Sequence, residues 1–243
     1  ASVVAFATLF SVEAALSAVA LVWTYHSYGE RLWNWKVSLS WVAKLFHDSW
    51  PLLFAGVSIM LYMRLDVIML NKMQGAHETG IYSAATRISE AWNFVPMALM
   101  AALQPVLLRT KQDNPALFIK RMDILYAFTA WASIAVAVVM SVTSSLAVRL
   151  LFGVNFEAAG SVLALHIWAE VAVYLGVASS QYLLAENLQK ISMFRTAFGL
   201  VTNVLLNLAL IPKYGAPGAA AATVVSYFLA TFSLVVFAST RAQ

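Results

Sequence analysis

Residues 124–148 read ILYAFTAWASIAVAVVMSVTSSLAV and contain no charged side chain. An α-helix rises about 1.5 Å per residue, so about 20 apolar residues cross the roughly 30 Å hydrocarbon core of a bilayer. The stretch is continuously apolar and does not alternate between apolar and polar residues as a half-buried strand would. An open sheet would also leave backbone groups unpaired in lipid. The stretch therefore predicts a membrane-spanning helix.

Similar apolar segments recur along the whole chain, separated by short polar connections. With 124–148 included, the predicted spans are 3–24, 51–71, 80–104, 124–148, 160–184, 194–212 and 217–238. The composition agrees, since 62% of the residues are hydrophobic and 11% are charged. A soluble domain has roughly 45–50% apolar and about 25% charged residues. We predict an all-α polytopic membrane protein with about seven transmembrane helices.

The positions of the Lys and Arg residues predict the orientation of these helices, because basic residues concentrate in cytoplasmic loops. If the first helix runs from outside to inside, the cytoplasmic set is Arg31, Lys36, Lys44, Arg109, Lys111, Lys120, Arg121, Lys190, Arg195 and Arg241. The outer set is Lys72, Arg149 and Lys213. We therefore expect a multi-pass protein of the cytoplasmic (inner) membrane with a cytoplasmic C-terminus. No basic run exceeds two residues, so the net charge of +4 does not predict nucleic-acid binding.

Residues 26–50 are too polar to span a membrane. They combine aromatic rings with basic residues, namely Trp33, Trp35, Trp41, Trp50, Lys36 and Lys44. Such a mixture suits the headgroup level, which predicts an interfacial amphipathic helix on the cytoplasmic surface. A cytoplasmic loop packed on the bundle is the alternative. Either interpretation divides the chain into one helix over 1–25, a linker over 26–50, and a block of six helices over 51–243.

Charged side chains inside spans cost roughly 2.5–3.5 kcal/mol each and are functional candidates by default. Arg64, Asp66, Arg87 and Glu90 lie in two neighbouring predicted helices, at similar depth. One interpretation is a polar cavity in which all four bind substrate and the arginines hold an anion. Guanidinium is suited to phosphate because its planar donors match phosphate oxygens in pairs. The alternative is a neutral brace, in which Asp66 pairs with Arg87 and Arg64 with Glu90.

A second group of polar residues lies in two later spans. His166 and Glu170 are four residues apart, and we interpret them as candidates for proton coupling or as an interhelical contact. Asn203 and Asn207 share one helix face, where amides commonly join helices, so we expect a packing role. No catalytic motif occurs, and two ligands at helical spacing are weak evidence for a metal. We predict no catalytic residue, no metal and no cofactor.

Motifs from most of the chain resemble the polysaccharide-biosynthesis flippases, the Wzx-type members of the superfamily that also contains multidrug exporters and the lipid II flippase. The residues that carry the resemblance are Trp50–Gly56, Tyr62–Asp66, Gly80–Ala85, Arg87–Glu90, Pro96, Asn203, Asn207, Ile211–Gly215 and Gly218–Thr223. The resemblance implies two six-helix lobes around a central cavity, with both termini cytoplasmic. In that arrangement 3–24 resembles the last helix of the first lobe, and 51–238 resembles the complete second lobe. About five helices of the first lobe would then precede this sequence.

The resemblance implies alternating-access flipping of a lipid-linked oligosaccharide, linked through polyprenyl pyrophosphate, for polysaccharide or O-antigen biosynthesis. The implied partners are this substrate, membrane lipids and other polysaccharide-assembly proteins. A drug/cation antiporter of the same fold is the first alternative, although its cavity should favour carboxylates over arginines. A membrane glycosyltransferase or polymerase is the second. We expect such an enzyme to carry a large extramembrane loop, and the predicted outer loops are short, so we expect no enzyme.

Overall fold

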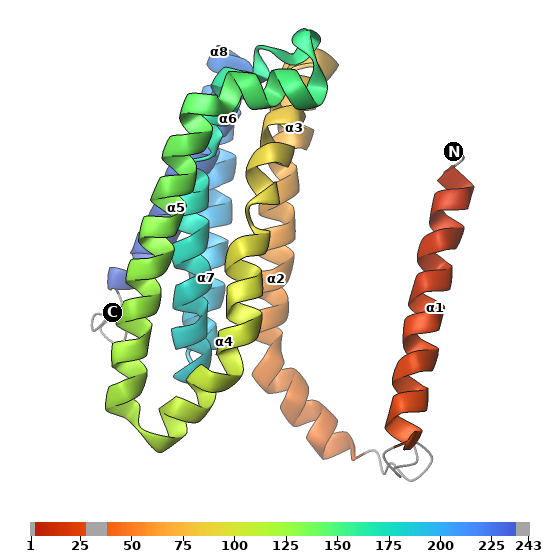
Figure 1. The fold of residues 1–243 in the computed structure, drawn as a ribbon, viewed down its shortest axis with the longest axis vertical. Coiled ribbons are helices and arrows are strands. Elements are labelled where there is room, and N and C mark those ends of the chain that lie inside the picture. Colours follow the sequence, from red (N-terminus) through yellow and green to blue (C-terminus); the bar gives the residue numbers. More distant parts are fainter. Residues whose placement is uncertain (1–2, 28–37, 237–243) are drawn as a thin grey trace. The chain divides into compact units, whose positions relative to one another are not determined.

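The computed structural model describes residues 3–27 and 38–236, which form helices joined by short connections (Figure 1). The elements in chain order are α1 (Val3–Ser27), α2 (Leu39–Gln74), α3 (Ala76–Ala91), α4 (Phe94–Asp113), α5 (Pro115–Phe152), η2 (Val154–Phe156), α6 (Ala159–His166), α7 (Ala169–Ala185), α8 (Gln189–Phe232) and η3 (Ser233–Val236). These ranges contain no strand. The all-α prediction is confirmed.

The chain divides into two units, Ala1–Ser49 and Trp50–Gln243. The first unit contains α1, which covers the predicted span 3–24, and the beginning of α2. In the predicted linker, Lys44 Nζ lies 5.4 Å from the centroid of the Trp41 ring, a cation–π contact within one helical stretch. Trp33, Trp35 and Lys36 lie outside the described residues. The interfacial position of this segment and its role as a link between lobes stay predictions.

Within the part of the chain that the structure describes, five helical stretches are long and apolar enough to cross a membrane, so this is a multi-pass membrane protein. They are Ser49–Gln74, Ala76–Asp113, Pro115–Phe152, Ala159–Ala185 and Gln189–Phe232. The first four contain the predicted spans 51–71, 80–104, 124–148 and 160–184. The fifth contains 194–212 and most of 217–238, while the grouping of these spans into a six-helix lobe stays a prediction.

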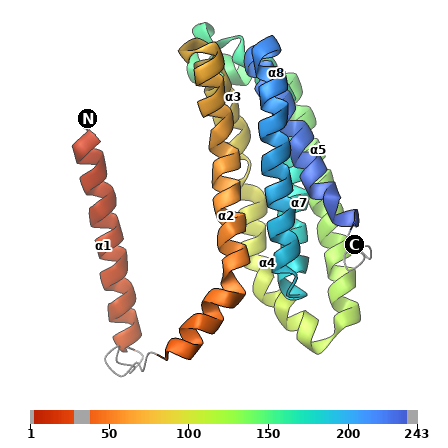
Figure 2. The same ribbon diagram turned by 180° about the vertical axis from the view of Figure 1, so that it is seen from behind.

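Helix α8 consists of two antiparallel arms that meet at Gly215. That residue has φ 58° and ψ −134°, a backbone conformation that glycine adopts far more readily than other residues. A Cβ on Gly199 would lie 2.9 Å from the Ala230 Cβ, and Asn203 Nδ2 donates to Ser226 Oγ over 3.4 Å. Contacts between residues this far apart in one element require the chain to fold back, as Figure 2 shows. The chain therefore turns back on itself at Gly215.

Two polar side chains from the region where α2 meets α3 cap this turn. Gln74 Nε2 donates to the Ile211 carbonyl over 2.9 Å, at the end of the first arm. Glu78 Oε2 accepts from the Ala216 amide over 2.8 Å, at the start of the second arm. Helix ends leave unpaired carbonyls and amides, and a carboxylate is favourable at a helix N-terminus. These contacts fix the turn of α8 to the α2–α3 connection.

The two ends of α5 carry residues that favour helix boundaries. Asn114 accepts a hydrogen bond from the Leu117 amide over 3.0 Å, and Pro115 occupies the first turn. This combination is typical of a helix start. Gly153, with φ 84°, ends α5.

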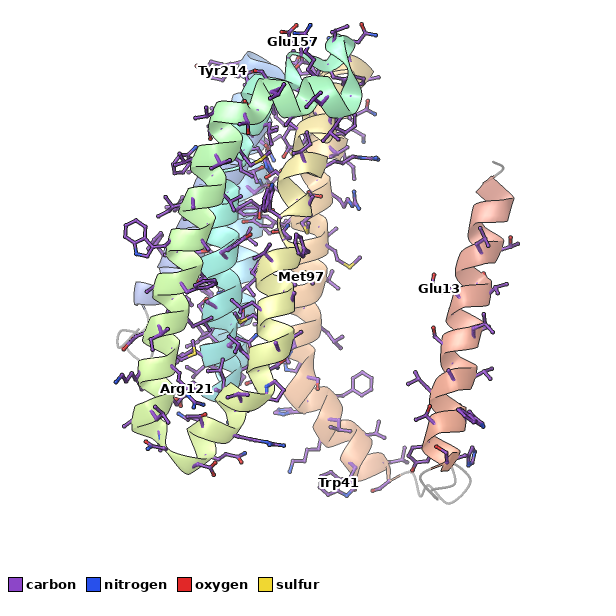
Figure 3. All side chains as sticks on the ribbon, viewed as in Figure 1. Glu13, Trp41, Met97, Arg121, Glu157 and Tyr214 are labelled. Carbon is purple, nitrogen blue, oxygen red and sulfur yellow. The ribbon has the colours of Figure 1, made fainter. Side chains whose placement is uncertain are left out.

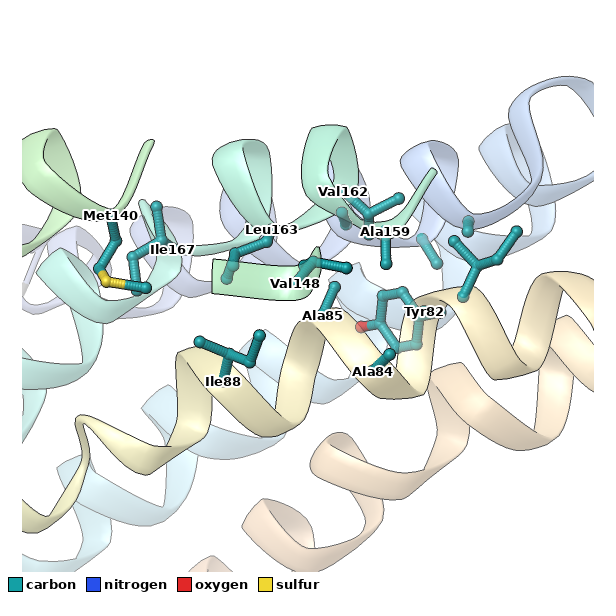
Figure 4. Close-up of a cluster of buried hydrophobic side chains, with 14 of the residues drawn as sticks. Tyr82, Ala84, Ala85, Ile88, Met140, Val148, Ala159, Val162, Leu163 and Ile167 are labelled. Carbon is teal, nitrogen blue, oxygen red and sulfur yellow. The ribbon is translucent and has the colours of Figure 1, made fainter. Parts of the chain in front are cut away.

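The apolar core of the second unit lies where α3, α5 and α6 meet. Figure 4 shows Ala85 and Ile88 of α3 facing Leu163 of α6 and Val148 of α5. By contrast, many large apolar side chains project outward from the helices, as Figure 3 shows for the described residues. On α5, Trp131 is 73% exposed and Val142 is 82% exposed. An apolar outer surface of this kind is what a bilayer covers.

Candidate functional site

Two interruptions of the helices lie beside the polar interior of the second unit. Residues Trp92 and Asn93 separate α3 from α4, and Ile167 and Trp168 separate α6 from α7. At the first interruption, the Trp92 carbonyl accepts from the Val95 amide over 3.1 Å and also from the Tyr174 hydroxyl over 3.0 Å. Irregular backbone at membrane depth occurs where it is buried in protein or lines a cavity.

The four charged residues predicted to bind substrate line one cavity of about 210 Å³. Arg64 and Asp66 reach it from α2, and Arg87 and Glu90 from α3. We call it the arginine cavity, and its remaining lining residues are Met63, Val67, Tyr82, Ser83, Thr86, His166, Thr223 and Tyr227. Sequence spacing thus identified side chains that the fold brings together, while their role in binding stays a prediction.

Asp66 accepts hydrogen bonds from uncharged donors on α3 and on both arms of α8. Its Oδ2 accepts from the Tyr82 hydroxyl over 2.9 Å and from Thr223 Oγ1 over 2.6 Å, and its Oδ1 accepts from Asn207 Nδ2 over 2.5 Å. The carboxylate is 3% exposed. Hydrogen bonds to the charged form stabilise a buried carboxylate. No ion pair joins Asp66 to Arg87 among the described residues, and the carboxylate instead bonds Tyr82, Thr223 and Asn207.

Arg64 and Arg87 are exposed at the border of the cavity. Within the described ranges, neither guanidinium has an ion-pair partner, and the ion pair that does form there joins Lys111 to Glu186. Glu90 is half-buried. Both arginines interact with it electrostatically, but neither lies within ion-pair distance of its carboxylate. The guanidinium donors are therefore available to an anion.

A second cavity, also of about 210 Å³, adjoins the first. It lies along α7, and its walls include the apolar Ile59, Val173 and Val177. We call it the α7 cavity. The residues that line both cavities are Met63, Glu90, His166 and Tyr227. A polar compartment therefore borders a largely apolar one.

His166 and Glu170 come together through a residue that the sequence analysis did not identify. Ser89 of α3 donates its hydroxyl to Glu170 Oε1 over 3.1 Å, and His166 Nδ1 lies 3.0 Å from Ser89 Oγ. The predicted pair is thus bridged by Ser89. Ser89 is part of the motif Arg87–Glu90, but nothing in the sequence indicates that its hydroxyl points toward α6 and α7.

Asn203 and Asn207 have the interhelical contacts expected of packing amides. Asn207 Nδ2 donates to Asn203 Oδ1 over 3.0 Å as well as to Asp66. Both amide side chains are fully buried. They join the two arms of α8 to α2, and their assignment to packing stays a prediction.

Arg195 is a second functional candidate that sequence reasoning missed. It is counted above among cytoplasmic basic residues, but its side chain is 7% exposed and lines the α7 cavity. It donates to Ser179 Oγ over 2.5 Å, to Ser180 Oγ over 2.8 Å and to the Gly176 carbonyl over 3.2 Å. Its position at the start of the predicted span 194–212 was the one indication in the sequence that Arg195 lies inside the bundle.

In the described part of the chain, no three His, Cys, Asp or Glu side chains gather as a metal site would require. The polar interior instead offers guanidinium donors at one cavity and a histidine–serine–glutamate chain between the two. The fold and this interior define a helical multi-pass membrane protein with charged groups held inside the bundle.

Residues 1–111 match a protein family described as polysaccharide biosynthesis protein. The resemblance stated from the motifs is confirmed over that range, which includes Arg64, Asp66, Arg87 and Glu90. The match links this part of the chain to polysaccharide biosynthesis. Comparison with curated proteins and with solved structures gives no match.

Proposed function

We propose that the protein flips a lipid-linked oligosaccharide, joined to its lipid through pyrophosphate, across the cytoplasmic membrane by alternating access. The observation that carries this proposal is the pair Arg64 and Arg87, which border one cavity without a carboxylate partner in the described ranges. Two guanidinium groups on neighbouring helices offer paired donors to a pyrophosphate. The similarity of residues 1–111 to polysaccharide biosynthesis proteins supports the same class of substrate.

The proposed activity forms and breaks no covalent bond, so the protein acts as a transporter and not as an enzyme. Its substrate is amphipathic, with an anionic head, a polar glycan and a lipid tail. The tail stays in the bilayer, which the exposed apolar surface of the helices contacts. The unit 51–243 forms the second lobe of a MATE-like pair, and 3–24 belongs to the first.

The topology of the proposed transporter is tested by reporter fusions at helix ends. Fusions after residues 112 and 190 will report a cytoplasmic location, and fusions near 75, 155 and 214 will report the outside. The reason is the excess of Lys and Arg on one side of the predicted spans. The inverse pattern would overturn both the orientation and the cytoplasmic C-terminus.

A drug/cation antiporter of the same fold is the second candidate. The observation in its favour is Glu170, whose buried Oε2 has no hydrogen-bond partner among the described residues and which lines the α7 cavity. A buried carboxylate of this kind attracts cations. The two candidates differ in the charge of the transported molecule. The phenotype of a single deletion strain therefore distinguishes them.

Deletion of the gene in its native host will abolish a surface glycan and leave the matching lipid-linked oligosaccharide on the cytoplasmic leaflet. The measurement is surface glycan by gel or antibody, together with glycan accessibility in inside-out and right-side-out vesicles. Susceptibility to cationic drugs serves as the second readout and will be unchanged. Normal surface glycan with increased drug susceptibility would instead establish the antiporter.

A further inference from the structure

A continuous hydrogen-bonded chain of titratable and hydroxyl groups crosses the wall between the two cavities. It runs from His166 Nδ1 to Ser89 Oγ over 3.0 Å, and from Ser89 to Glu170 Oε1 over 3.1 Å. The three side chains are nearly sealed from the surface, with exposed fractions of 4%, 0% and 2% in that order. A serine hydroxyl has one proton, so it accepts from His166 while it donates to Glu170.

Of the two ends of the chain, only His166 reaches the arginine cavity. His166 lines both the arginine cavity and the α7 cavity, whereas Glu170 lines the α7 cavity alone. Within the described residues, Glu170 Oε2 has no hydrogen-bond partner. A carboxylate oxygen that is buried and unpaired is costly when charged, and it is a natural place for a proton.

Helical spacing explains why these residues meet, because positions four apart lie on one face. His166 ends α6 and Glu170 lies in the first turn of α7, and Ile167 and Trp168 between them keep a right-handed helical backbone. Both side chains thereby reach Ser89 on α3. The Tyr82 ring packs edge-on against His166, with centroids 5.8 Å apart, and holds the imidazole in place.

Other charged and titratable groups surround the chain on every side. Those on the α7 cavity, or next to Glu170, are Tyr62, Glu90, Tyr174, Arg195 and Tyr227. Those on the arginine cavity are Arg64, Asp66, Tyr82, Arg87 and again Glu90. Among the carboxylates, Asp66 has hydrogen-bond partners for both oxygens and Glu90 is half-buried, which leaves Glu170 as the enclosed group with an unpaired oxygen.

We propose that His166, Ser89 and Glu170 form a proton relay that loads Glu170 from the arginine cavity. A hydronium ion in that cavity gives a proton to His166 Nε2 and becomes water. His166 Nδ1 passes its proton to Ser89 Oγ, and the Ser89 hydroxyl proton moves to Glu170 Oε1. The imidazole ends as the neutral Nε2–H tautomer and Glu170 as a carboxylic acid, so one proton has moved and no other bond has changed.

The relay deepens the proposed function, on which its link to transport rests. Protonation of Glu170 removes one negative charge from the wall of the cavities. An anion held by Arg64 and Arg87 is then bound more tightly, because a nearby repulsive charge is gone. By reciprocity, a bound pyrophosphate favours protonation of Glu170. Proton occupancy and substrate occupancy are therefore coupled.

Infrared difference spectroscopy after a pH jump tests the relay on the full-length protein in nanodiscs. The wild type will show a carboxylic acid C=O band as Glu170 becomes protonated, and Glu170→Gln will lack it. Ser89→Ala will slow the appearance of this band at least about tenfold, since a positioned proton carrier contributes that much or more. Ser89→Cys keeps a weak donor and acceptor, so the band will appear at a rate between those of the wild type and Ser89→Ala.

The matched control is Ser133→Ala, because Ser133 is equally buried but bonds only to the Ala130 carbonyl of its own helix. Its rate will equal that of the wild type. A band that forms at the wild-type rate in folded Ser89→Ala, or that persists in Glu170→Gln, would overturn the relay. If Ser89→Ala does not fold, the relay is tested by the other two variants. The band should be absent in Glu170→Gln and should form more slowly than in the wild type in Ser89→Cys.

Addition of farnesyl pyrophosphate as a probe separates the relay from the proposed function. The probe will increase the protonated fraction of Glu170 at fixed pH. A normal relay with no response to the probe would refute the coupling to a pyrophosphate and leave the proton site intact. A probe that binds while Glu170 shows no band would refute the relay and leave the pyrophosphate site intact.

Discussion

Replacing Arg64 or Arg87 with Gln will block glycan export while the protein remains folded in the membrane. A hydrogen bond to a charged group contributes about 1.5–3 kcal/mol, so loss of one such contact corresponds to a decrease of about 10- to 100-fold. Both side chains are exposed at the cavity border, and Gln preserves most of the side-chain length. Neither change leaves a carboxylate without its partner, because neither arginine is ion-paired within the described ranges.

The measurement is surface glycan alongside membrane abundance for each variant. Arg64→Lys and Arg87→Lys will restore export only in part, since an ammonium group cannot make the paired planar contact. Arg149→Gln is the matched control, because Arg149 is an exposed arginine in the last turn of α5, away from both cavities. Normal export from both Gln variants would refute the cationic site.

Much of the fold follows from patterns that act along the chain. Apolar runs specify the spans, Asn114 and Pro115 specify the start of α5, and Gly153 and Gly215 permit conformations that other residues resist. These signals are local, so sequence alone carries them. The positions of Arg64 and Arg87 in neighbouring antiparallel spans also predicted that the two side chains lie at similar depth in the membrane.

Contacts that depend on how each helix is rotated about its axis could not be predicted in this way. Sequence spacing suggested that Asp66 pairs with Arg87 because both carry charge at similar depth. In the structure, the carboxylate turns toward α8 and meets Thr223 and Asn207 instead. Those partners are more than a hundred residues away, so only packing of the whole unit brings them to Asp66. The bridge through Ser89 was missed for the same reason.

Replacing Asp66 with Ala will destabilise the protein more than any other single change at the cavities. Tyr82, Asn207 and Thr223 would each lose a buried hydrogen bond to the charged carboxylate at once. Each keeps a second, uncharged partner, namely Thr223, Asn203 and the Ala219 carbonyl in that order. A hydrogen bond to a charged group contributes about 1.5–3 kcal/mol, and the neighbouring effects are not additive, so we expect a total loss of about 3–5 kcal/mol.

Asp66→Asn will be much milder than Asp66→Ala. The amide keeps one oxygen acceptor, and the hydroxyls of Tyr82 and Thr223 can rotate to accept from its nitrogen. The measurement is the thermal unfolding midpoint of the full-length protein in detergent, together with membrane abundance. Asp123→Ala, an exposed carboxylate on α5, is the matched control and will change the midpoint little.

The double variant Asp66→Ala/Arg87→Gln separates this cluster from a charge brace. If Asp66 served to neutralise Arg87, removing both charges together would restore abundance and stability. Because the carboxylate is bonded to Tyr82, Thr223 and Asn207, removal of Arg87 supplies no acceptor to those donors. We therefore expect the double variant to be as unstable as Asp66→Ala alone. Recovery of the unfolding midpoint in the double variant would show that Asp66 stabilises the protein by neutralising Arg87. Charge pairing, and not the hydrogen bonds to Tyr82, Thr223 and Asn207, would then be the source of stability at this cavity.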